Sequence, residues 1–205
     1  HPDLAEMSGI VRSSFDGIYW VHNDSGDEPR IFAIDVDGNV QIPGWISERD
    51  PMKWSGHTIH AAWHSDWEDI ALADGKIYIA DVGNNGNARR DMGIYVVNEV
   101  HPTAIAAARS MKWLPVRYPD QKAFPAEIWH FDCEAVFTDG GKLYFLTKHR
   151  QPFQAAAWEP GTKLYRLDTE YTDQDNVLTH VSTRDDIVLA TGADVSPDGD
   201  RLAIV

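Results

Sequence analysis

The sequence predicts an all-β protein, and more specifically a β-propeller made of four-stranded antiparallel blades. Three observations support this: a strand pattern recurs about every sixty residues, each copy contains an Asp-Gly turn, and helical periodicity is scarce. Short β-branched and aromatic runs bounded by Gly, Asp and Asn are typical of strands, and Asp-Gly between two such runs favours a hairpin. Repeated four-stranded units describe propeller blades.

Four copies of one residue order make up the repeat. Each copy opens with an acid and an apolar run, turns at Asp-Gly, and continues into a second apolar run. A third run follows at residues 31–34, 93–97 and 163–167, and candidates for the fourth strand are 40–42, 111–114 and 177–181. The opening acids, separated by 62, 66 and 60 residues, are Glu6, Glu68, Glu134 and Asp194. Helix has one candidate, because the Ala-rich stretch from Pro102 to Arg109 could form two turns.

These copies predict a single partial propeller domain over residues 1–205. Its units are expected at about 6–65, 66–130 and 131–190, with an incomplete unit at 191–205. A propeller closes with about four to eight blades, whereas the chain supplies about three and a half. We therefore expect a fragment of a longer propeller, whose remainder comes from missing sequence or from another chain.

The composition limits the classes of binding partner that the chain can have. The chain has 205 residues and a formal charge of −14, which argues against nucleic acid or an anionic membrane as the main partner and is compatible with cations. No apolar run approaches the ~20 residues of a membrane span. The single cysteine, Cys133, excludes an internal disulfide and predicts a buried thiol. A periplasmic or extracellular location fits this composition.

The opening acids predict a metal site. First strands of successive blades surround the central axis, so Glu6, Glu68, Glu134 and Asp194 should converge at one mouth of the channel. Clustered carboxylates raise each other's pKa unless a cation is bound, and oxygen ligands favour Ca²⁺, with Mg²⁺ as the alternative. Acids at strand ends can instead cap turns or bind backbone amides between blades, and that interpretation stays open.

The ends of the second strands should border the same mouth, because the end of strand two lies beside the start of strand one in a hairpin. Asp24 and Asn85 are predicted ligand-binding residues, and Lys148 could hold an anionic group or neutralise an acid. Asp81 and His22 are the candidate general bases. A weaker possibility is a transition-metal site at His57, His60 and His64, whose spacing would suit one helical face.

Four segments resemble uncharacterised bacterial propeller proteins: SGIVRSSFDGIYWVHNDSGD, DWEDIALADGKIYIADVGNN, DCEAVFTDGGKLYFLTKH and TGADVSPDGDRLAIV. These are broadly similar to gluconolactonase-like, regucalcin-like and phytase-like propellers. The resemblance implies six blades and a divalent cation, usually calcium, in the axial channel. Glu6, Glu68, Asp81, Glu134 and Asp194 match its ligands by their place in the repeat. Lys148, where an acid might be expected, departs from those enzymes.

Two functions remain open at this point. The first is a metal-dependent hydrolase of lactone or phosphoester bonds, in which the cation polarises the scissile group of a small-molecule substrate. The second is a non-catalytic ligand-binding or scaffold propeller with a structural cation.

Overall fold

The computed structural model describes residues 1–49 and 53–205, with only the backbone at residue 155. The all-β prediction is confirmed, since the described chain consists of strands and loops with one short helix, α1 (Gly44–Ser47). That helix, the only one among the described residues, has neither the length nor the hydrophobicity to cross a membrane.

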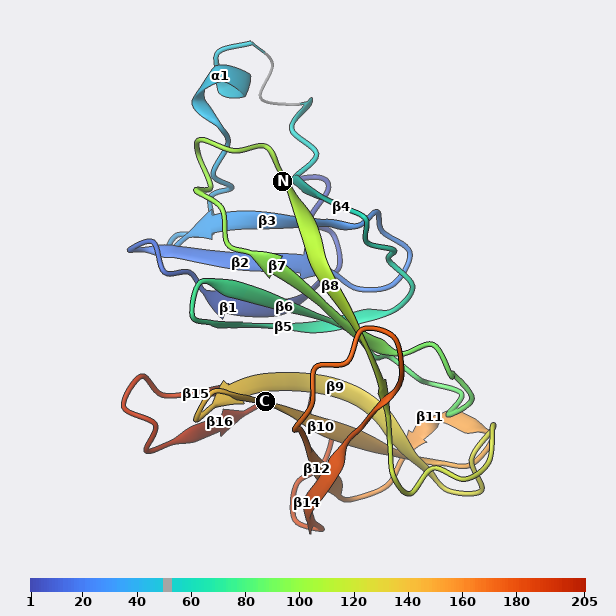
Figure 1. Cartoon of the computed structure of the whole chain (residues 1–205). Helices are drawn as coiled ribbons and strands as arrows, with labels where there is room; N and C mark the ends of the chain where they lie inside the picture. The colour runs from blue at the N-terminus through green and yellow to red at the C-terminus, as the bar shows by residue number, and fades with distance from the viewer. Residues whose placement is uncertain (50–52) are drawn as a thin grey trace.

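The largest sheet occupies the upper part of Figure 1. Its path runs through β1 (Met7–Arg12), β2 (Ile18–Asn23), β3 (Arg30–Asp35), β4 (His57–His60), β8 (Ala107–Arg117), β7 (Gly93–Asn98), β6 (Lys76–Asp81) and β5 (Trp67–Ala73). A ninth strand, β13 (Asn176–Val177), pairs in parallel with β8. The two ends of this path, β1 and β5, contact each other, so the sheet is nearly closed.

A second sheet lies below the first in Figure 1. It contains β9 (Trp129–Asp139), β10 (Lys142–Gln151), β11 (Gln154–Trp158), β12 (Thr162–Leu167) and β14 (Thr179–Arg184). A third sheet is the hairpin of β15 (Ala193–Val195) and β16 (Leu202–Ile204). The strands β5 to β8 pair antiparallel in chain order, as do β9, β10, β12 and β14.

The strands β1, β5, β9 and β15 contact one another in succession, and each of them opens one copy of the sequence repeat. The core lies between the neighbouring sheets. One buried cluster joins Val96 and Leu114 to Phe145 and Tyr165, and thus joins the upper sheet to the lower one. The succession brings the beginnings of four separate sequence segments into one region.

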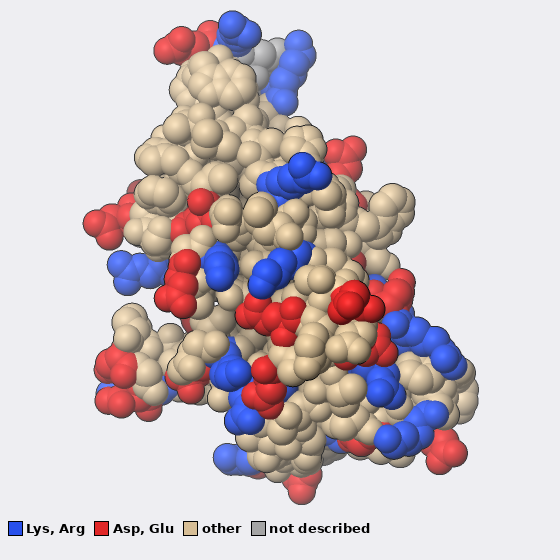
Figure 2. Space-filling model, viewed as in Figure 1, with Lys and Arg blue, Asp and Glu red and all other residues tan. Residues whose placement is uncertain are grey.

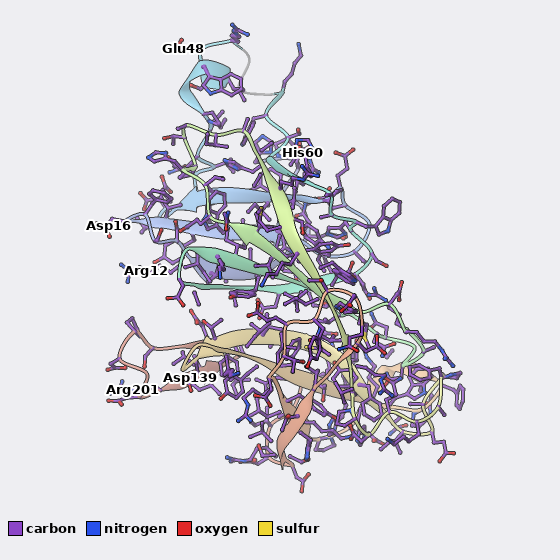
Figure 3. All side chains as sticks on the ribbon, in the orientation of Figure 1. Arg12, Asp16, Glu48, His60, Asp139 and Arg201 are labelled. Atoms are coloured by element: carbon purple, nitrogen blue, oxygen red, sulfur yellow. The ribbon has the colours of Figure 1, made fainter. Side chains whose placement is uncertain are left out.

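Two local predictions are wrong. Residues 102–104 form a turn, and Ala107–Arg109 belong to β8 in place of a helix, because they pair in parallel with His60 and its neighbours on β4. His57 and His60 lie on β4, where three-residue spacing places them on opposite faces: His57 is buried and His60 is exposed. Figure 3 shows His60 on β4, in the upper part of the molecule. Among the described residues, these histidines join no group with metal-ligand spacing.

Candidate metal centre

The carboxylates of the candidate centre come mainly from two equivalent segments. Asp66 and Glu68 open β5, and Asp132 and Glu134 lie in β9. Both ladders are irregular here, with Glu68 as the extra residue between Trp67 and Asp69, and Glu134 between Cys133 and Ala135. Such an irregularity re-aims a side chain, and the two acids of each segment lie close together. The residue between them points the other way, where Trp67 and Cys133 are fully buried. Because β5 and β9 are neighbours, the acidic faces of both segments meet.

Two groups of carboxylates result, and Glu68 belongs to both. The first group is Asp24, Asp66 and Glu68, and the second is Glu68, Asp132 and Glu134. In each group, one oxygen from every member lies within 4.8 Å of the others. Asp24 reaches the first group from the loop after β2. Such groups of oxygen ligands can hold a metal ion.

The loop after β6 leaves room for these acids. A Cβ added at Gly83 would overlap Oε1 of Glu68 and Oδ2 of Asp66. Only glycine therefore lets the backbone pass so close to both carboxylates. Any side chain at this position would displace Glu68 or Asp66.

The second group carries its own counter-charges. Lys148 Nζ lies 2.5 Å from Glu134 Oε1, and Arg150 Nε lies 2.7 Å from Asp132 Oδ2. Arg150 also donates to Asn85 Oδ1 at 2.5 Å. All four charged side chains are at most 11% exposed, so solvent screens these pairs weakly.

The first group lacks such counter-charges among the described residues. No described residue forms an ion pair with Asp24, Asp66 or Glu68; the nearby Arg89 instead pairs with Asp81 at 2.9 Å. Burial raises the pKa of Glu68, and the carboxylates of Glu134, Asp24, Asp66 and Asp132 raise it further. Burial also raises the pKa of Asp66 to about 6, although Arg89 opposes the shift. Uncompensated carboxylates of this kind must either take up protons or bind a cation.

The two candidate bases are both enclosed. Asp81 is buried, pairs with Arg89, and accepts the backbone N–H of Asp66 at 3.1 Å, so it fixes the segment that carries Asp66. His22 is fully buried, and its Nδ1 lies 2.7 Å from the Asn23 carbonyl oxygen. Burial lowers the pKa of His22 to about 4, which keeps the ring neutral.

The structure brings some predicted ligands together and leaves others outside. Glu68 and Glu134 share the second group, Asp24 belongs to the first, and Lys148 and Asn85 border the second through their contacts. Glu6 is in neither group; it is exposed and lines a cleft of about 290 Å³ beside Asp24.

Asp194 is also outside both groups. It lines an open cleft of about 870 Å³ together with Asp139 and Arg201. Figure 3 labels Asp139 and Arg201 at the lower left, on the side away from β11 in Figure 1. Asp194 Oδ1 accepts the N–H of Val195 at 2.8 Å, just as Asp69 Oδ1 accepts that of Ile70. Asp194 therefore corresponds to Asp69, one residue beyond the position of Glu68.

The ligand prediction missed Asp66 and Asp132. The signal available was the Asp-x-Glu spacing that occurs in both Asp66-Trp67-Glu68 and Asp132-Cys133-Glu134. A two-residue spacing puts both acids on one face of a strand. The free thiol of Cys133 is buried, as predicted.

Comparison of the chain with models of protein families and with curated proteins finds no match.

Proposed function

We propose that the chain is a β-propeller protein that binds a divalent cation at the axial mouth, with Ca²⁺ favoured over Mg²⁺. The succession of β1, β5, β9 and β15 supports the propeller, because first strands surround the axis in that fold. The proposed units are residues 6–65, 66–130, 131–190 and 191–205. The likeness to six-bladed bacterial propellers remains part of this proposal.

One observation supports cation binding most strongly. Glu68 is 4% exposed, and the leading charged neighbours that set its pKa are four carboxylates. A cation among Asp24, Asp66 and Glu68 would remove this repulsion, whereas Lys148 and Arg150 already serve the second group. The first group is therefore the proposed site. Ca²⁺ takes six to eight oxygen ligands in flexible geometry, so three carboxylates and water suit it better than Zn²⁺.

A structural cation is the role that the geometry favours, because Asp81 and His22 are both enclosed. Hydrolysis of lactone or phosphoester bonds is the second candidate. It is favoured by Asp24, which is half-buried and lines the 290 Å³ cleft, so that a small-molecule substrate could reach a cation bound there. Calcium sites with few protein ligands function at the high calcium levels outside cells. A periplasmic or extracellular location thus belongs to the proposal.

Calcium titration of Glu68→Gln tests the proposal. Calorimetry should show saturable Ca²⁺ binding to the unmodified chain and at least about tenfold weaker binding to Glu68→Gln, since one charged ligand is lost. The matched control is Glu127→Gln, which neutralises an exposed acid outside both groups and should leave binding unchanged. Equal binding by both variants would place the cation elsewhere.

A further inference from the structure

A small cavity elsewhere in the molecule is lined mainly by positively charged and apolar side chains, in contrast to the acidic candidate metal centre. It lies between the loop after β6 and the segment that follows β8, and has a volume of about 280 Å³. Arginines and apolar side chains line most of it: Arg89, Arg90, Arg117, Met92, Val116 and Phe124. We call this the arginine cavity. Figure 2 shows Lys and Arg side chains gathered at the lower right, around the place of β11 in Figure 1.

The sign of its charge is unusual for this chain. The chain carries a net charge of −14, yet three guanidinium groups and one carboxylate, Asp175, line the arginine cavity. Arg117 Nε lies 3.5 Å from Asp175, and both side chains are about half exposed. An exposed pair of this kind contributes little and can exchange partners. Arg89 is occupied by Asp81 and Asp91.

Arg90 is the key residue, because it forms no ion pair with any described residue. Its guanidinium carbon lies 4.2 Å from the centroid of the Phe124 ring. Stacking of this type uses the flat face of the guanidinium group and leaves the N–H donors at its edge available. The aromatic ring therefore holds Arg90 in place without satisfying its hydrogen bonds.

Apart from Asp175 and Gln121, whose side chain donates to the Asn87 carbonyl oxygen, the remaining wall is apolar. Met92 is 2% exposed and Val116 is 4% exposed, so both belong to the core behind the cavity. A ligand that reaches them replaces water against an apolar surface. Ligand pockets commonly combine such a surface with a few placed polar groups.

We propose that the arginine cavity binds a small organic oxoanion, with its phosphate or carboxylate group held by Arg90 and Arg117 and its apolar part against Met92 and Val116. Paired guanidinium groups suit both oxoanions because their N–H donors match two oxygens at once. This site is separate from the candidate metal centre. It requires no cation, so its success or failure does not depend on the proposed function.

Calorimetric titrations in buffer with a chelator test the proposal, using phenyl phosphate, benzoate, inorganic phosphate and neutral benzyl alcohol. We expect saturable binding of phenyl phosphate or benzoate, and the tighter of the two identifies the oxoanion. Inorganic phosphate should bind more weakly because it cannot use the apolar wall. Benzyl alcohol should not bind measurably.

Three variants localise the site. Arg90→Gln should weaken binding at least about tenfold, as loss of a charged hydrogen-bonding partner does, and Arg117→Gln should weaken it to a smaller degree. Arg12→Gln is the control, since Arg12 is also exposed and unpaired among described residues but lies away from the arginine cavity. Melting temperatures verify that the variants fold. The proposal is overturned if neither organic anion binds at 10 mM, or if Arg90→Gln binds as tightly as Arg12→Gln.

Discussion

Glu68 is the residue on which the candidate metal centre depends. It lies between two groups of acids, and only one of these groups has counter-charges of its own. Repulsion among these carboxylates destabilises the cation-free protein and favours the binding of a cation. Neutralising Glu68 should therefore stabilise the cation-free protein and destabilise the cation-bound protein.

Lys148 provides a test of the compensated group. Lys148→Gln removes the contact of Glu134 at 2.5 Å and leaves it the longer contact with Arg150 Nη2 at 3.4 Å; Lys148 and Glu134 are both about nine-tenths buried. Removing one member of a buried pair typically costs about 3–5 kcal/mol, so urea denaturation should show a loss of that order. Lys112→Gln is the control, because its pair with Glu170 is about half exposed and should matter little. Similar losses in both variants would contradict the compensation of Glu134 by Lys148.

The pH dependence of stability follows from the acids with raised pKa values. Burial raises the pKa of Asp66 from 3.8 to about 6 and that of Asp69 from 3.8 to about 8. A raised carboxyl pKa means that the folded state holds the proton more tightly, so the stability it contributes at low pH is lost as pH rises through these values. His22, with a pKa lowered to about 4, acts in the opposite sense only below pH 6.5.

We therefore expect the metal-free protein to lose stability between about pH 6.5 and pH 8, where the acids dominate. Adding Ca²⁺ should reverse the part of this loss that comes from Glu68, whose pKa is raised within the candidate centre, but not the part from Asp69, which lies outside it. Urea denaturation at several pH values, with chelator and with Ca²⁺, measures both effects. A metal-free protein that grows more stable over this range would contradict the raised pKa values.

At the scale of elements, Asp69 joins neighbouring first strands. Its Oδ2 accepts the N–H of Val136 at 2.8 Å, and thereby links β5 to β9. This is the backbone-binding role that the sequence left open for acids at strand ends. Asp69 and Glu68 are adjacent, at the irregularity of the β5–β6 ladder. Asp69 binds the backbone of β9, whereas Glu68 faces the carboxylates.

Asp69→Ala should destabilise the protein by about 1–3 kcal/mol, because the buried N–H of Val136 loses its acceptor. Asp194→Ala is the comparison, since Asp194 is exposed and, among the described residues, its side chain bonds only to the neighbouring N–H of Val195. Its effect on the denaturation midpoint should be clearly smaller. Calcium affinity should survive both changes. Equal losses of stability in the two variants would show that the hydrogen bond from Val136 to Asp69 contributes no more than the one from Val195 to Asp194.

The elements also show how far the sequence could predict the site. β-Branched and aromatic runs joined by Asp-Gly turns were enough to predict β5, β6, β9 and β10. Alignment of the repeats by their acids placed Asp194 one residue out of register, and in a strand such a shift moves the side chain to the other face. Glu6 is also out of register: the β1–β2, β5–β6 and β9–β10 ladders are irregular after Met7, Trp67 and Cys133, so Glu6 corresponds to Asp66, and Ser8 holds the position of Glu68. The parallel pairing of β4 with β8 joins distant segments that share no local signal.

At the scale of the whole molecule, the centre lies where β5 and β9 meet, with Asp24 arriving from the loop after β2. A cation bound by Asp24, Asp66 and Glu68 would join two of the proposed units, and Glu68 in turn lies against Asp132 and Glu134 of a third. Because the folded state alone assembles these ligands, binding should stabilise the entire fold.

Ca²⁺ at one hundred times its dissociation constant should add about 2.7 kcal/mol to the free energy of unfolding. The melting temperature should rise with Ca²⁺ and return on chelation, whereas Glu68→Gln should respond little to either. In chelator at pH 8, Glu68→Gln should be at least as stable as the unmodified chain, because Gln avoids the cost of protonating Glu68, whose pKa is raised to about 10, on folding. A melting curve that is insensitive to chelator and to Ca²⁺ would contradict a structural role of the cation.

A crystal structure determined with Ca²⁺ would locate the cation. We expect one density peak among Asp24, Asp66 and Glu68, with oxygen atoms at about 2.3–2.6 Å, while Lys148 and Arg150 keep their contacts with Glu134 and Asp132. Absence of a peak there at saturating Ca²⁺, or a peak at another place with these three carboxylates apart, would contradict it.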